Sequence, residues 1–200
     1  QIEKAGQYVP DTEGPHAAMT YRQHIVALYA GYNLTFDKWA GRLGARMERT
    51  WNDANGEERD ADTYSFRNRQ FNVIPYASLT YKPAERHNLS LSYTQRIQRP
   101  NIERLSPATD DSDPLVIIYG NPDLVAAVFN SLNLQYSYFA TKFSLTFALT
   151  NFFSNNYMSY WSRVNEEGIT LTTPTNDVHT RSYGSVSYTH LRAHETRHDL

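Results

Sequence analysis

Charged and aromatic side chains are the residues of this sequence that could bind a ligand. Arg96 and Arg99 lie close together, and Asp110, Asp111 and Asp113 follow them. Ion pairs between the two groups would hold the intervening loop in place. The alternative is that they are solvated charges, which contribute little. Aromatic side chains beside polar groups suit sugars or large chelates, and the candidates for substrate contact are Tyr64, Phe66, Tyr119, Tyr157, Tyr160 and Trp161.

Catalytic chemistry has weaker support. Serine, histidine and aspartate all occur, but His24, His87 and His179 are scattered along the chain. The sequence contains no Gly-x-Ser-x-Gly motif, which would place a nucleophilic serine on a tight strand-to-helix turn. We therefore predict that the protein is not an enzyme and needs no cofactor.

Residues 186–200 abandon the pattern of the rest of the chain. Two of them, His190 and His194, have a spacing that lets histidines on a helix share a metal ion, and Glu195 follows. However, Val186-Ser-Tyr-Thr-His-Leu-Arg-Ala-His-Glu-Thr196 resembles the translation of a transposase sequencing adapter. Segments of this kind are excluded from fold reasoning. We therefore predict no metal site, and expect residues 186–200 to be an artefact and residues 1–185 to be part of a longer protein.

Strands of alternating polarity must position these residues. In the segments 88–94, 132–138 and 143–150, every second residue is Leu, Phe or Tyr, and those between are mostly Ser, Thr, Asn or Gln. Because side chains on a strand alternate between faces, each segment has one apolar and one polar face. Similar strands are expected at about 23–36, 39–51 and 70–82, with a seventh beginning at 181. Pro75 indicates an edge or a bulge, because proline cannot donate to a ladder.

The connections between the expected strands alternate in length. Short turns are predicted at 37–38, 83–87 and 140–142, and long loops at 52–69, 99–127 and 154–180. Strands of ten residues or more with this alternation indicate a transmembrane β-barrel, with short periplasmic turns and long extracellular loops. A soluble β-sandwich also alternates polarity, but its strands are shorter and its connections are mixed. In a barrel, Arg42, Arg46 and Glu48 would face the lumen, whereas Gly41, Leu43, Ala45 and Met47 would face lipid.

The composition agrees with a membrane barrel. The chain of 200 residues has a net charge of −2, 14% aromatic residues and no cysteine. No run approaches the roughly 18 apolar residues of a transmembrane helix. The fifteen tyrosines suit membrane interfaces, and Tyr157, Tyr160 and Trp161 could belong to such a girdle instead of a substrate site. The near-neutral charge gives no support for nucleic-acid binding.

Several short motifs resemble one family. The segments 94–100 (Thr-Gln-Arg-Ile-Gln-Arg-Pro), 105–107 (Leu-Ser-Pro), 120–124 (Gly-Asn-Pro-Asp-Leu) and 181–184 (Arg-Ser-Tyr-Gly) occur in the order seen in TonB-dependent outer-membrane receptors, in the outer-membrane β-barrel subfamily. The resemblance spans about residues 20–185. One departure is that Ala126 and Ala127 stand where the family usually has Pro-Glu.

The resemblance implies a 22-stranded barrel in the outer membrane, closed by an N-terminal plug. About seven of its strands would lie in this chain. Such receptors bind a scarce nutrient outside the cell and import it when an energised inner-membrane complex pulls on the plug. The implied partners are outer-membrane lipid, the nutrient, the TonB-type complex and, in some receptors, a surface lipoprotein. The candidate binding residues are Arg42, Arg46, Tyr64, Phe66, Arg96, Arg99, Asp110, Asp111, Tyr119 and Trp161. The alternatives are a passive porin-like or structural barrel and, with less support, a barrel enzyme.

Overall fold

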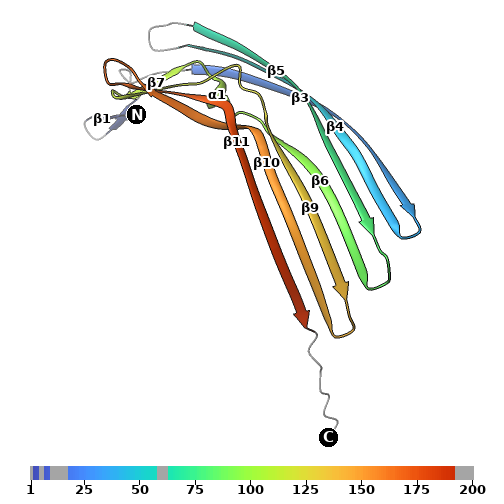
Figure 1. Ribbon diagram of the computed structural model, residues 1–200. Helices are drawn as coiled ribbons and strands as arrows, with labels where there is room; N and C mark the ends of the chain where they lie inside the picture. Colours follow the sequence, from blue (N-terminus) through green and yellow to red (C-terminus); the bar gives the residue numbers. More distant parts are fainter. Residues whose placement is uncertain (1, 5–6, 10–17, 58–62, 192–200) are drawn as a thin grey trace.

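Long antiparallel strands form nearly all of the protein. The computed structural model describes residues 2–4, 7–9, 18–57 and 63–191. Within these residues, seven long strands lie side by side in one curved sheet, with the order β3-β4-β5-β6-β9-β10-β11 (Figure 1). Their bounds are Ala18–Phe36 (β3), Trp39–Glu57 (β4), Thr63–Tyr81 (β5), His87–Gln98 (β6), Ala127–Phe139 (β9), Phe143–Val164 (β10) and Thr170–Leu191 (β11).

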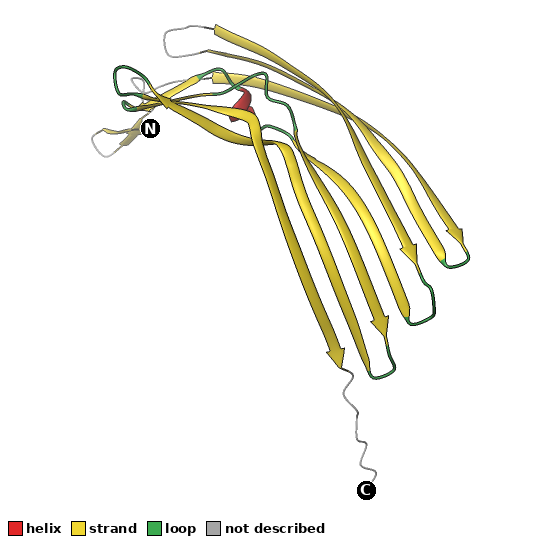
Figure 2. Ribbon diagram, viewed as in Figure 1, coloured by secondary structure: helices red, strands yellow, loops and turns green. Residues whose placement is uncertain are grey.

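Short elements gather at one end of this sheet (Figure 2). A one-turn helix α1 (Ile102–Leu105) and a hairpin of β7 (Thr109–Asp113) and β8 (Val116–Tyr119) lie between β6 and β9. Strand β8 joins the main sheet by parallel pairing with the first residues of β11. A separate hairpin is formed by β1 (Ile2–Lys4) and β2 (Gln7–Val9). No helix in the described part of the chain is long and apolar enough to cross a membrane.

One face of the sheet carries a continuous apolar band. Cross-strand neighbours on this face of β3, β4 and β5 form rows such as Leu28–Met47–Val73 and, at the lower end, Phe36–Trp39–Tyr81. The other face carries the polar residues. This arrangement confirms the predicted lipid-facing and lumen-facing sets on β4. The large apolar side chains of the band are exposed, with Leu28 at 68% and Phe36 at 74%, because lipid and not protein would cover them.

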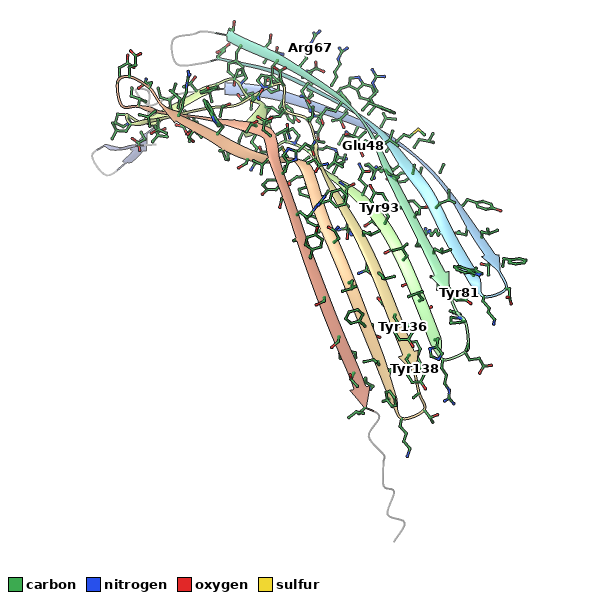
Figure 3. The ribbon with its side chains drawn as sticks, in the orientation of Figure 1. Glu48, Arg67, Tyr81, Tyr93, Tyr136 and Tyr138 are labelled. Atoms are coloured by element: carbon green, nitrogen blue, oxygen red, sulfur yellow. The ribbon has the colours of Figure 1, made fainter. Side chains whose placement is uncertain are left out.

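The height of the band matches a bilayer. From Arg49 down to Trp39, β4 advances about 34 Å at 3.4 Å per residue. At a strand tilt of about 40°, this corresponds to about 26 Å along the membrane normal, close to the ~25 Å apolar band of outer-membrane barrels. Aromatic residues mark the lower edge: Trp39 and Tyr81 stack with centroids 4.2 Å apart, and His87 lies 4.9 Å from Tyr138. Tyr81, Tyr136 and Tyr138 line this edge in Figure 3.

The predicted long loops at 52–69 and 154–180 are largely wrong. Strand β4 continues to Glu57 and β5 begins at Thr63, while β10 continues to Val164 and β11 begins at Thr170. Above the bilayer both faces of a strand meet water or other loops, so the sequence loses its alternation while the backbone ladder continues. The short turns at 37–38 and 140–142 are as predicted, with Asp37 at a positive φ of 48°, and the turn predicted at 83–87 lies one residue earlier, at 82–86.

Pro75 marks the point where two strands separate. It pairs with Ala45 on β4, but the pairing of β5 with β6 ends at the next residue, Tyr76. A proline has no N–H to donate, so the hydrogen-bond ladder between β5 and β6 stops where residue 75 would have to donate a backbone N–H. The upper half of β5 therefore diverges from β6, and the segment 99–126 fills the inner side of this gap.

Candidate functional site

The segment 99–126 covers the inner face of β4 and β5. Asn68 donates hydrogen bonds to the carbonyls of Pro122 (2.8 Å) and Leu124 (2.9 Å). Gln70 donates to the same Leu124 carbonyl (3.1 Å) and accepts from the Ala126 N–H (2.9 Å). These polar side chains are buried beneath the segment 99–126, which excludes water. Their hydrogen bonds to this segment replace the hydrogen bonds that water would make. The inner face of β4 and β5, which we call the wall, and the segment 99–126, which we call the cover, thus form one packed unit at the extracellular end.

A buried ion cluster anchors the beginning of this segment. Glu48 on β4 is completely buried and binds two arginines, Arg46 on the same strand and Arg99 at the end of β6. Arg99 donates through Nε to the Oε1 atom of Glu48 at 2.7 Å and through Nη2 to the same oxygen. Of the two interpretations of the sequence, the ion pair of Arg99 with Asp110 or Asp113 is therefore not observed, because Arg99 pairs with the Glu48 carboxylate that β4 presents.

Apolar side chains complete the contact between wall and cover. Ala54 and Phe66 from the wall pack against Leu105 and Leu124 from the cover, and all four are buried. Phe66 was predicted as a candidate ligand contact on a loop. In the structure it lies on β5 with 6% of its surface exposed, so it contributes to packing.

Two of the family-like motifs contact each other. The N–H groups of Gly120 and Asn121 donate to the carbonyls of Ser106 (3.0 Å) and Arg104 (2.7 Å). A Cβ atom on residue 120 would lie 2.2 Å from the Ser106 oxygen and 2.8 Å from the Arg104 oxygen. Only glycine allows this approach. The Gly-Asn-Pro motif therefore docks on the Leu-Ser-Pro motif. The sequence alone indicates only a turn at this motif.

An extracellular cavity of about 520 Å³ lies above this contact. It brings together four of the predicted residues: Tyr64 from β5, Asp110 from β7, Tyr119 from β8 and Tyr160 from β10. Arg104 also lines the cavity, and its guanidinium lies 5.4 Å from the centre of the Tyr160 ring. The cavity thus combines aromatic surfaces with one cation, Arg104, and two carboxylates, Glu103 and Asp110. The complete lining is Met19, Tyr64, Glu103, Arg104, Ser106, Ala108, Thr109, Asp110, Ile118, Tyr119, Gly120, Tyr160 and Pro174.

Asp110 is held in its ionised form at the edge of this cavity. Its carboxylate accepts hydrogen bonds from the Ser112 hydroxyl (2.6 Å) and from the Ser112 N–H (3.1 Å). These bonds lower the pKa of Asp110, the hydroxyl having the larger effect. The side chain of Asp111 lies outside the described set.

The remaining predicted residues lie away from the cavity. Arg42 and Arg46 are on the lumen face of β4, where their guanidinium groups lie over the rings of Tyr76 (5.4 Å) and Tyr29 (4.9 Å). Arg96 lines a smaller hollow of about 260 Å³ on β6, β9 and β10. Trp161 is half-exposed on β10, and its cross-strand partner is Thr173, not the cavity residue Pro174.

No metal centre is found among the described residues. His190 lies on β11 with Tyr188 as its neighbour, while His194 and Glu195 fall outside the described residues. Sequence reasoning missed Arg104, which lines the cavity, and the buried amides Asn68 and Gln70. A basic residue directly before the Leu-Ser-Pro motif was the one available signal for Arg104.

An antiparallel sheet with a bilayer-high apolar band, a polar inner face and short turns at one end defines a wall segment of a transmembrane β-barrel. The family comparison agrees: residues 1–193 match the model of the outer membrane protein beta-barrel family. The chain therefore belongs to this family and to the outer membrane, and the predicted resemblance is confirmed. No curated protein sequence matches the chain significantly.

Solved structures with a similar fold include iron and siderophore receptors. The FrpB iron transporter of Neisseria meningitidis is 13% identical, with a TM-score of 0.57 over 86% of this chain and 24% of its own. The siderophore receptor PiuA of Acinetobacter baumannii is 15% identical, with a TM-score of 0.60 over 88% and 24%. A ferric enterobactin receptor mutant (PfeA) of Pseudomonas aeruginosa, in complex with enterobactin, is 11% identical, with a TM-score of 0.53 over 84% and 33%. The chain thus spans about a quarter to a third of these structures.

Proposed function

We propose that this chain forms part of the wall and extracellular binding surface of a TonB-dependent receptor that imports a scarce nutrient. The observation that carries the proposal is the extracellular cavity, which Tyr64, Tyr119 and Tyr160 line together with Arg104, whose guanidinium lies over the Tyr160 ring. Aromatic rings give a large apolar ligand contact area, and a guanidinium attracts anionic oxygen. A catecholate-type or carboxylate-type ferric chelate has both properties.

The two incompletely paired edges of the sheet indicate that it is part of a larger barrel. The outer edge of β3 has no paired strand among the described residues, and the second edge of β11 is paired only by the short strand β8. Lipid cannot satisfy unpaired backbone groups, so an open sheet is not stable in a bilayer. We therefore infer that further strands close the wall.

Uptake by the full-length protein tests this proposal. The gene would be expressed in a host without its own siderophore receptors, and the cells would be given a panel of radiolabelled ferric chelates. We expect uptake of at least one chelate, and we expect it to disappear when TonB is deleted or the proton gradient is collapsed. Entry that persists without TonB would identify a passive porin-like barrel instead.

A pair of variants tests whether the cavity binds the ligand. Tyr119→Ala combined with Arg104→Gln removes one ring and the cation, and we expect binding of the transported chelate to weaken at least tenfold. The control is Trp161→Ala combined with Arg163→Gln, a cation–ring pair on β10 outside the cavity, with the Arg163 guanidinium 6.0 Å from the Trp161 ring centre. Equal binding by the two double variants would show that the cavity is not the ligand site.

A further inference from the structure

Four arginines form a cluster on the outer wall, directly above the apolar band. Arg22 on β3 lies in register with Asp53 on β4, which lies in register with Arg67 on β5. One row lower, Arg69 is opposite Trp51, and Arg49 is two residues below Trp51 on β4. All four arginines are exposed and lie on the face that carries Leu28, Met47 and Val73. We refer to Arg22, Arg49, Arg67 and Arg69 as the arginine cluster.

Internal pairing neutralises only part of this charge. Asp53 forms an ion pair with Arg67, with the Arg67 Nε atom 3.3 Å from Oδ1 of Asp53, but the two side chains remain 46% (Asp53) and 75% (Arg67) exposed, so the pair is weak. For the other three arginines, no ion pair is found in the described ranges. The Arg49 guanidinium lies 5.4 Å from the centre of the Trp51 ring, which holds it at the upper edge of the apolar band.

The cluster is confined to β3, β4 and β5. On the same face of β6, β9 and β10, the polar residues among the apolar ones are the uncharged Gln95, Asn130 and Asn151. On β11 this face carries a single arginine, Arg181, which lies over the ring of Phe153 at 5.6 Å. A general need for solubility would distribute charge around the rim, whereas this wall concentrates four cations in one place.

The height of the cluster points to its ligand. It lies at the end of the band opposite the short turns, which is the outer-leaflet side of an outer-membrane barrel. Lipid headgroups at this level carry phosphates, and arginine binds phosphate through a planar fork of donors. Arg22, Arg67 and Arg69 also line a shallow open groove of about 860 Å³ together with Thr20, His24 and Asp53.

We propose that the arginine cluster binds the phosphate groups of lipid A, the phosphorylated glycolipid of the outer leaflet. The headgroup would lie in the groove, with its phosphates between β3 and β5. Its acyl chains would follow the apolar positions of β3 and β5 that begin at Val26 and Phe71, the cross-strand neighbours of Arg49. The wall would in this way have a fixed annular lipid at β3–β5.

Lipid binding by the full-length protein in detergent tests the proposal. Dissociation constants would be measured by native mass spectrometry for bisphosphorylated lipid A, for the same lipid without phosphates and for inorganic pyrophosphate. We expect bisphosphorylated lipid A to bind at least tenfold more tightly than either of the other probes. Pyrophosphate binding as tight as that of lipid A would overturn the proposal in favour of a free-anion site, and equal binding of the two lipids would show that the phosphates are not recognised.

Two double variants locate the site. Arg67→Gln/Arg69→Gln should weaken binding of bisphosphorylated lipid A at least tenfold. Arg22→Gln/Arg49→Gln should do the same without touching the Asp53–Arg67 pair, so a folding defect from breaking that pair cannot explain both results. The control Lys82→Gln/Lys142→Gln removes the same charge from exposed turn residues at the periplasmic rim and should leave affinity unchanged. Equal loss in all three variants would show that only overall charge matters and would refute the assigned site.

Discussion

Replacing Glu48 with glutamine should release the segment 99–126 from the barrel wall. The Glu48 carboxylate is fully buried and accepts from both Arg46 and Arg99. Hydrogen bonds to charged groups contribute about 1.5–3 kcal/mol each. Part of that stabilisation offsets the cost of burying the carboxylate itself. Both arginines are also about one-third exposed (33% and 31%), so they can recover water. We therefore expect a net loss of about 2–3 kcal/mol in the attachment of the segment.

This loss is local, so the assay must report local opening. The strand ladders of the wall do not involve the Glu48 side chain, and the barrel itself should remain folded. A loss of 2–3 kcal/mol raises the open population about 30- to 150-fold. When opening and closing are fast, the cleavage rate follows that population. Trypsin would be added to outer-membrane vesicles containing the full-length protein, and cleavage after Arg104 would be followed by mass spectrometry.

Controls separate this effect from a general change. Glu166→Gln makes the same chemical change at an exposed turn between β10 and β11 and should leave cleavage at Arg104 unchanged. Arg99→Gln should also accelerate cleavage, and the double variant Glu48→Gln/Arg99→Gln should cost less than the sum of the two single variants, because the residues share one interaction. Cleavage at the same rate in Glu48→Gln and Glu166→Gln would refute the role of the ion cluster.

Two further predictions compare matched substitutions. Gly120→Ala places a Cβ against two backbone oxygens and should destabilise the docked motif by about 1–3 kcal/mol, whereas Gly184→Ala, which meets no atom within 4 Å, should be neutral. Protease protection of the segment 99–126 measures the difference, and equal protection would contradict the docking of the two motifs. Leu134→Arg on the lipid face of β9 should cost about 2–4 kcal/mol, while Gln135→Arg on the lumen face should be tolerated. Urea-induced unfolding in lipid vesicles measures both, and similar costs would contradict the assignment of faces.

The sequence predicted the strands most accurately where lipid lies against them. The alternating segment 88–94 lies in the strand observed at 87–98, because lipid on one face and lumen on the other enforce strict alternation. Above the bilayer this constraint disappears, and the upper halves of β4, β5, β10 and β11 were therefore taken for loops. Pairing between backbone groups, which leaves little trace in side-chain type, continues the strands there.

Individual contacts of the candidate site were harder to predict. The type and location of Arg99 indicated an ion pair, but its partner Glu48 is 51 positions away and was assigned only to the lumen face. Choosing between Glu48 and the nearer aspartates required the register of β4 against β5 and the gap beside Pro75. Tyr64, Asp110 and Tyr119 do line one cavity, because β5, β7 and β8 converge at the extracellular end.

The end of β11 bears on the proposal that residues 186–200 are not native. Along β10 the lipid face carries Leu145 and Phe147, but their partners on β11 are Thr189 and Ser187. The lumen face of β11 carries Val186 and Tyr188 instead. At residues 186–189, the apolar side chains of β11 thus lie on the lumen face and the polar ones on the lipid face, the reverse of β10. This reversal supports the proposal that residues 186–200 are not native. Sequencing of the source genomic DNA across this point should show apolar residues at 187 and 189, and a native codon for each residue of 186–200 would contradict it.

Cysteine labelling tests the central claim, that this chain is a membrane-spanning barrel wall with the segment 99–126 and the turn 165–169 outside the cell. The chain has no cysteine of its own, so single substitutions can be read separately once any others are removed from the full-length protein. With a membrane-impermeant maleimide, Glu166→Cys should label in intact cells, Lys38→Cys only after the outer membrane is permeabilised, and Leu43→Cys in neither condition. Labelling of Lys38→Cys in intact cells, or of Leu43→Cys from water, would contradict the orientation and the lipid-facing band from which this account is built.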